Sequence, residues 1–203
     1  MRTRAFVGFA LVGLVAVGFY ARMPVVRAEV TAGKATRAAV GEAAPGFALK
    51  DEFGKEFQLS EFKGKIVVLE WLNPECPVSK GHHEKGTMQD TYKKYAKDMV
   101  WLGIDSTGGA KGEDERVYAA RMEMAYPILL DGDGKVGHAY GATNTPHLFV
   151  IDKSGKLAYA GAIDDQGKTN YVADAVTALI EGKPVAKPKT KPYGCGVHYA
   201  RGH

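Results

Sequence analysis

The feature that most constrains the fold is a nearly continuous apolar run from Lys65 to Leu72 (KIVVLEWL). A strand with one buried face alternates apolar and polar residues, whereas a nearly continuous apolar run of this length predicts a strand buried on both faces of a parallel sheet. Both faces of such a sheet must be covered by helices. The run therefore predicts an α/β fold in which this segment is the central strand.

The remaining segments alternate between strand and helix patterns. In chain order we expect a hairpin over 47–59, the buried strand 65–72, a helix from 77 to about 97, a strand over 99–104, a helix over 113–124, a strand over 127–130, a short helix over 135–140, a hairpin over 146–160 and a last helix over 171–181. This order predicts a mixed central sheet flanked by helices.

The formal charge of +4 comes entirely from residues 1–28, which carry four arginines and no acidic residue. Without those four, the 27 basic residues become 23 and equal the 23 acidic ones, so nucleic acid is not an expected partner. The apolar run 5–21 and the small residues near Ala28 are typical of an export signal. An uncleaved membrane anchor is the alternative, and both place the folded part in the periplasm or outside the cell.

Composition divides the rest of the chain into three parts. Residues 29–44 are small and polar and are expected to form a leader, and residues 45–181 are long enough for one well-buried domain. Residues 182–203 form an arm that begins with a lysine- and proline-rich stretch and carries Cys195. The arm has few apolar residues with which to dock, so we expect its order to depend on a covalent link or on its few aromatic side chains.

The strongest local signal for chemistry is Cys76, which lies between the buried strand and the next helix and is followed by Pro77. A thiol at a helix N-terminus faces unpaired backbone N–H groups and the positive end of the helix dipole, which stabilise its thiolate. Lys80 adds a nearby positive charge. We therefore expect Cys76 to be a nucleophile with a pKa below that of an ordinary thiol.

Several motifs resemble those of one family, the redoxins, which are AhpC/TSA-like proteins of the thioredoxin fold. The motifs are Gly41-Glu-Ala-Ala-Pro45, Leu59 to Lys65, Trp71-Leu-Asn-Pro-Glu-Cys-Pro77, Thr145-Pro146, and Gly194-Cys-Gly-Val-His-Tyr199. The resemblance implies a thioredoxin-like fold, a redox-active cysteine at Cys76 and a thiol-dependent oxidoreductase without a cofactor. It also implies a cis-proline at Pro146, beside which Thr145 can offer backbone groups to an extended substrate.

Two departures from the family pattern bear on the activity. Ser79 stands where thioredoxin-like reductases have a second cysteine, so a local disulfide cannot form. Asn73 stands where peroxiredoxins have a hydroxyl, and their downstream arginine is missing, which favours thiol–disulfide exchange over peroxide reduction. We place Asn73 and Pro77 with Thr145 and Pro146 in the substrate-binding set.

Cys195 has three interpretations: a resolving cysteine for Cys76, half of a structural disulfide, or an unpaired thiol. The leading hypothesis is an exported thiol–disulfide oxidoreductase in which Cys76 attacks and Cys195 or an external thiol resolves. Its partners would be protein or small-molecule disulfides and thiols, and an external thiol reductant.

The alternatives are a thiol peroxidase acting on hydroperoxides, a redox-inert binding module, and a soft-metal carrier. The last would use Cys76, Cys195, His147 and His198, although no two-cysteine ligand motif supports a metal site. We expect His82 and His83 to be solvated side chains on the helix after Cys76.

Overall fold

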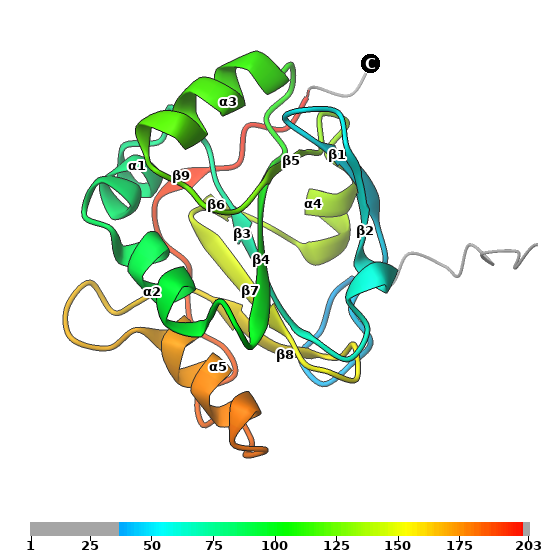
Figure 1. Cartoon of the computed structure of the whole chain (residues 1–203), viewed down its shortest axis with the longest axis vertical. Coiled ribbons are helices and arrows are strands. Elements are labelled where there is room, and N and C mark those ends of the chain that lie inside the picture. The colour runs from blue at the N-terminus through cyan, green and yellow to red at the C-terminus, as the bar shows by residue number, and fades with distance from the viewer. Residues whose placement is uncertain (1–36, 201–203) are drawn as a thin grey trace, which may run out of the picture. The chain divides into compact units, whose positions relative to one another are not determined.

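Figure 1 shows a computed structural model of the chain, in which residues 37–200 are described. The expected export signal, the first part of the leader and the last three residues lie outside the described residues. Within residues 37–200, no helix combines the length and the apolar composition that a membrane crossing requires.

A seven-stranded mixed sheet forms the centre of the molecule, in the order β2-β1-β5-β4-β3-β7-β8. Its strands are β1 (Ala48–Asp51), β2 (Glu56–Gln58), β3 (Ile66–Trp71), β4 (Met99–Asp105), β5 (Ile128–Leu130), β7 (His147–Ile151) and β8 (Leu157–Gly161). β3 pairs in parallel with β4 and antiparallel with β7. All six residues of β3 are buried, which confirms the prediction of a strand covered on both faces.

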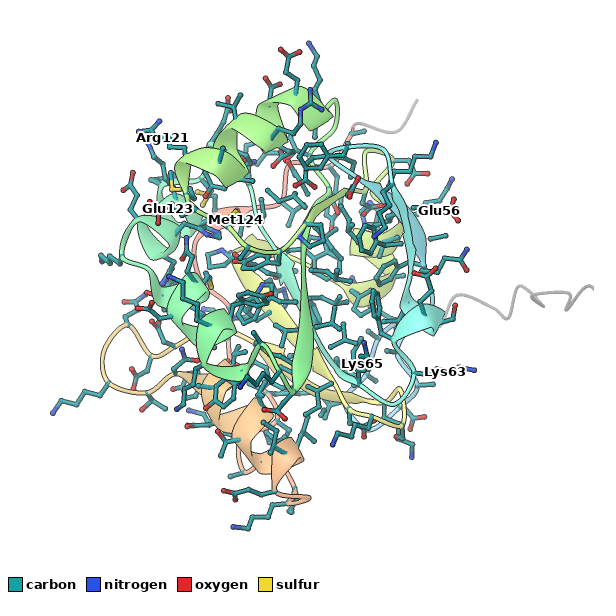
Figure 2. The ribbon with its side chains drawn as sticks, viewed as in Figure 1. Glu56, Lys63, Lys65, Arg121, Glu123 and Met124 are labelled. Atoms are coloured by element: carbon teal, nitrogen blue, oxygen red, sulfur yellow. The ribbon has the colours of Figure 1, made fainter. Side chains whose placement is uncertain are left out.

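Successive side chains of β3 point to opposite faces and enter two different cores. On one face, Ile66 and Val68 pack with residues of α2 (Thr87–Tyr95) and α5 (Tyr171–Ile180). On the other face, Leu69 and Trp71 pack with α4 (Lys135–Tyr140) and with the segment that precedes β1. Figure 2 shows side chains filling the space between the central strands and the helices. The sheet is thus a middle layer, as the sequence predicts.

A third cluster lies under α3 (Gly112–Arg121), which covers the end of the sheet where β3 and β4 finish. Leu72, just beyond β3, packs there against Tyr118 and Ile128. A short 3-10 helix, η1 (Leu59–Phe62), leads into β3. The polypeptide leaving β3 therefore emerges beside α3, where Cys76 follows.

The single helix expected after Cys76 is in fact two helices, α1 (Pro77–Glu84) and α2. Gly86 separates them with a φ of 74°, a left-handed conformation that glycine adopts without steric cost. The periodicity of Met88, Tyr92 and Tyr95 predicts α2 correctly, whereas a glycine inside a helical pattern does not by itself announce a break.

Two segments outside the expected domain pack against it. Ala38 N–H donates to the Ala139 carbonyl at 2.8 Å, and Ala43 forms a β-bridge with Lys156. Residues 38–44 therefore pack against the domain that was expected to begin at Pro45, and they are not a free leader. At the other end, β9 (Cys195–Gly196) of the arm pairs with β6 (Asn144–Thr145) in a separate two-stranded sheet.

Candidate active site

Cys76 caps the N-terminus of α1, at the end of the loop that follows β3. Its backbone is extended, and Pro77 occupies the first turn, where a missing N–H costs nothing. The Ser79 N–H points at the Cys76 Sγ at 3.5 Å. Only 2% of Cys76 is exposed, so its sulfur is covered by neighbouring groups.

Asn73 holds the loop that carries Cys76. Its side-chain oxygen accepts from the Glu75 N–H at 2.7 Å, and its Nδ2 donates to Thr107 Oγ1 at 3.1 Å. Its backbone oxygen accepts from the Cys76 N–H at 3.0 Å. The amide group is thus engaged within the protein, and it ties the cysteine loop to the segment after β4.

Thr145 and Pro146 lie beside Cys76 and are joined by a cis peptide bond. In its thiol form Cys76 donates to the Thr145 carbonyl oxygen, with the two atoms 3.0 Å apart. Both Thr145 and Pro146 are buried. The structure therefore brings together Cys76, Thr145 and Pro146, three of the residues expected at the site.

The arm brings Cys195 to the same place. β9 runs antiparallel to β6, with Cys195 directly opposite Thr145. Gly194 permits this approach: its φ is 114°, and a Cβ at this position would overlap the Thr145 carbonyl oxygen. Both cysteines are free thiols, and Cys195 is partly exposed.

The two thiols share a hydrogen bond that distinguishes them electrostatically. Burial acts to raise the pKa of Cys76, but hydrogen bonds from the Cys195 thiol and from the backbone of Ser79 and Cys195 favour its thiolate. The net result is a pKa below the ordinary value for Cys76. The same bond raises the pKa of Cys195, which also bonds to the backbone of Val78. Cys76 ionises first, and Cys195 donates to it.

The positive charge expected from Lys80 is not what lowers the pKa of Cys76. Lys80 Nζ lies 3.7 Å from Glu84 Oε1, one turn further along α1. The groups that stabilise the thiolate come instead from the helix N-terminus and from the arm.

The arm is anchored on both sides of Cys195. Upstream, Thr190 Oγ1 accepts from the Ala162 N–H at 2.9 Å. The Tyr193 hydroxyl contacts His82 Nε2 at 2.8 Å and donates to Asp164. Downstream, Tyr199 donates to the Ala142 carbonyl at 2.8 Å, and its ring stacks on His138 with 4.0 Å between centroids. The arm therefore docks while both cysteines are free, and of the two expected ways to order it, contacts of its aromatic side chains are the one observed.

The two histidines of α1 are not the solvated side chains that we expected. His83 is 3% exposed, and its Nε2 lies 2.9 Å from Glu70 Oε1 in the core. Trp101 and Tyr126 each donate to the other oxygen of Glu70 at 2.9 Å. The other histidine, His82, is half-buried beneath the arm. The rings of His83 and His82 therefore each link α1 to another part of the structure.

The four residues considered for a metal do not form a site. His147 is buried, which lowers its pKa to about 4, and its Nδ1 accepts from the Thr143 N–H at 3.3 Å. His198 is exposed on the arm. Across residues 37–200, no three His, Cys, Asp or Glu side chains are grouped so that they could hold a metal ion.

Two parts of the site could not be found by reading the sequence. Thr107 lies in the loop after β4 and belongs to no motif, and its bond to Asn73 depends on the parallel pairing of β3 and β4. The contact of Tyr193 with His82 and Asp164 joins three distant segments. The only indication of this contact in the sequence is the tyrosine at position 193, two residues before Cys195.

The fold and this pair of cysteines define a class, the redoxin-type thiol–disulfide oxidoreductases with a thioredoxin-like fold. Comparison with known families gives the same answer, because the AhpC/TSA family matches residues 40–160. The chain belongs to the AhpC/TSA family and is a thiol-dependent oxidoreductase.

Individual relatives agree with this assignment. The thiol–disulfide oxidoreductase ResA of Geobacillus thermodenitrificans is 34% identical over 122 residues, which cover 60% of this chain and 68% of ResA. Among solved structures, an uncharacterised conserved protein of Geobacillus kaustophilus is 26% identical with a TM-score of 0.72, covering 81% of this chain and 94% of its own. A Chlorobium tepidum protein described as a thiol:disulfide interchange protein DsbE is 25% identical with a TM-score of 0.55, covering 71% and 97%.

Proposed function

We propose that this protein exchanges disulfides through Cys76 and Cys195, which cycle between a dithiol and a disulfide. Cys76 supplies the stabilised thiolate of the pair, and Cys195 supplies the second sulfur of the disulfide. The observation that carries the proposal is the pairing of Cys195 with Thr145, which holds the Cys195 thiol in hydrogen-bond contact with Cys76 at the start of α1. The arm thus supplies the second sulfur that position 79, a serine, lacks.

The thiol–thiolate hydrogen bond supports catalysis more than a purely structural disulfide. A structural bridge needs only geometry, whereas an exchange reaction needs one sulfur that is stable as a thiolate, because the thiolate is both the attacking and the leaving species. The opposed shifts in the pKa values of the two cysteines meet that need. We therefore favour a redox-coupled role for Cys195 over a structural one.

The substrates are disulfides and thiols, and we rank them above hydroperoxides. Peroxide reduction needs polarising groups for the leaving hydroxide. The amide of Asn73, at the position of the peroxiredoxin hydroxyl, is engaged with Thr107 and the Glu75 N–H. Asn73 and Pro77 would act in the substrate site through the loop and helix end that they shape, and Thr145 and Pro146 through the surface beside Cys76.

We also propose that residues 1–28 direct export and that the arm begins at residue 182. The balanced charge of the remaining chain and the apolar run between arginines support export. An oxidising compartment would let the Cys76–Cys195 bridge persist. N-terminal sequencing of protein recovered from the cell envelope tests this: a start near residue 29 supports cleavage, and an intact N-terminus supports an anchor.

Stoichiometric exchange with glutathione disulfide tests the proposed function. The reduced protein should release two glutathione molecules per chain and lose both thiols. Cys195→Ser should release one and stop as a mixed disulfide on Cys76, and Cys76→Ser is the matched control for Cys195. Hydrogen peroxide should oxidise the protein more slowly than glutathione disulfide does. No release from the reduced protein would contradict the proposal, and rapid, saturable oxidation by micromolar peroxide would make hydroperoxide the better substrate.

A further inference from the structure

The two cysteines differ in how solvent reaches them, and this bears on where an external partner bonds. Cys76 is 2% exposed, whereas Cys195 is partly exposed and lies between Gly194 and Gly196, both exposed. The glycines leave no side chains beside the Cys195 sulfur on its own strand. A reagent arriving from solvent therefore meets Cys195 before it meets Cys76.

The part of the arm that covers Cys76 is held in place by specific contacts. β9 occupies the edge of β6, the position beside Pro146 where an extended substrate would pair. Tyr193 holds the arm on one side of Cys195, and Tyr199 holds it on the other. The ring of Tyr199 lies so close to Gly137 that a Cβ there would overlap it. An external partner that displaced the arm from Cys76 would have to break these contacts.

The electrostatics of the pair point to the same sulfur. In thiol–disulfide exchange the sulfur with the lower pKa leaves more readily, and the attacked sulfur must be accessible. Cys76 is the better leaving group because the start of α1 stabilises its thiolate. Attack on Cys195 expels Cys76 as that stabilised thiolate, whereas attack on Cys76 would have to reach a buried sulfur and would expel the less acidic Cys195.

We propose that Cys195, carried by the arm, is the sulfur that bonds covalently to external thiols, and that Cys76 acts behind it. In the oxidised protein an external thiolate attacks Cys195 Sγ, an external S–S bond forms, and the Cys76–Cys195 bond breaks with its electron pair going to Cys76. A second external thiolate then attacks the external sulfur of the mixed disulfide. The external disulfide leaves, and Cys195 takes up a proton. Two thiols are oxidised to one disulfide, and the protein gains two electrons and one proton, with Cys76 left as the thiolate.

The reverse reaction retraces these steps, so the Cys76 thiolate attacks Cys195 of a mixed disulfide and expels the partner. This inference rests on the proposed function, because it requires the two cysteines to form a disulfide. It places the external bond on Cys195, whereas a cysteine at the start of a helix, here Cys76, would ordinarily be expected to carry that bond. The partner class is a thiol or disulfide that contacts the outer face of β9.

Trapping the first mixed disulfide tests the inference. The purified oxidised protein is first checked by peptide mapping for the Cys76–Cys195 link. It is then mixed briefly with reduced glutathione in the presence of N-ethylmaleimide, quenched with acid and digested. We expect glutathione on the peptide of Cys195 and the maleimide on the peptide of Cys76. Glutathione on Cys76 with maleimide on Cys195 would overturn the inference while leaving the proposed function intact.

Single-cysteine variants provide a second measurement that does not depend on a transient species. At pH 9, Cys76→Ser, which retains Cys195, should react with glutathione disulfide at least about tenfold faster than Cys195→Ser, which retains Cys76, because access is then the main difference. Equal rates, or faster reaction of Cys195→Ser, would contradict the assignment. If mapping of the oxidised protein shows no Cys76–Cys195 link, the proposed function fails first.

Discussion

The carboxyl group of Glu115 offers a quantitative test of the packing beneath the cysteine loop. Glu115 lies on α3 and is 2% exposed. Burial, followed by a hydrogen bond to Asp105 and repulsion from it, raises the Glu115 pKa from the ordinary 4.5 to about 9. Asp105 in turn accepts from the Thr107 N–H at 2.7 Å, and Thr107 accepts from Asn73. A proton on Glu115 therefore supports the loop that carries Cys76.

This proton makes the stability of the protein depend on pH. Between pH 4.5 and about 9 the folded protein keeps the Glu115 proton and the unfolded chain does not, so unfolding releases a proton and the free energy of unfolding falls as pH rises. Each pH unit costs up to about 1.4 kcal/mol. From pH 5 to pH 7 the loss is about 1–3 kcal/mol, since part of the shift is shared with Asp105.

Glu115→Gln removes the titration and keeps a donor toward Asp105. Relative to the wild type, its free energy of unfolding should rise by about 1–3 kcal/mol between pH 5 and pH 7, or roughly 2–4 °C in Tm per kcal/mol. Urea unfolding of both proteins at pH 5, 6, 7 and 8 measures the difference, with Glu113→Gln as the exposed control on the same helix. A difference between Glu115→Gln and wild type that stays constant with pH would refute the assignment of the buried proton.

Three further predictions concern the arm. Cys195→Ala should raise the pKa of Cys76 above its value in Cys195→Ser, which keeps a hydroxyl donor; thiolate absorbance against pH measures both, and equal midpoints would contradict the hydrogen bond. Gly194→Ala should weaken docking of the arm by roughly 1–3 kcal/mol and slow closure of the Cys76–Cys195 disulfide. Gly196→Ala, where a Cβ has room, should do neither. Stopped-flow oxidation compares the two variants. Tyr193→Phe loses two hydrogen-bond partners and should speed tryptic cleavage at the arm's lysines, and an unchanged cleavage rate would show that Tyr193 does not anchor the arm.

The sequence predicts the layers of the fold because they depend on local patterns. The nearly continuous apolar run from Ile66 to Trp71 requires cover on both faces, and the structure provides it. The turn at Gly86 is different, because a glycine is compatible with a helix, a helix end or a break, and the left-handed conformation that separates α1 from α2 is set by how both helices pack.

The same distinction, between local sequence patterns and tertiary packing, applies to the site. Cys76, Thr145 and Pro146 are recognisable because they stand in short proline-containing motifs, one between β3 and α1 and the other just before β7, and β3 and β7 are neighbours. The position of Cys195 is not, because a proline-rich arm can reach many places. Its register against Thr145 depends on hydrogen bonds between distant segments in which Thr190 accepts and Tyr193 and Tyr199 donate, and no sequence periodicity indicates these bonds.

Titration of the two thiols in glutathione redox buffers tests the central claim most directly. The chain has two cysteines, so thiol counting and peptide mapping on samples quenched at each potential report the whole redox state. We predict that both thiols disappear together in one two-electron transition, that a single linked peptide joins Cys76 to Cys195, and that reduction restores both. Independent loss of the two thiols, or links only between separate chains, would contradict the claim that the arm completes the redox pair.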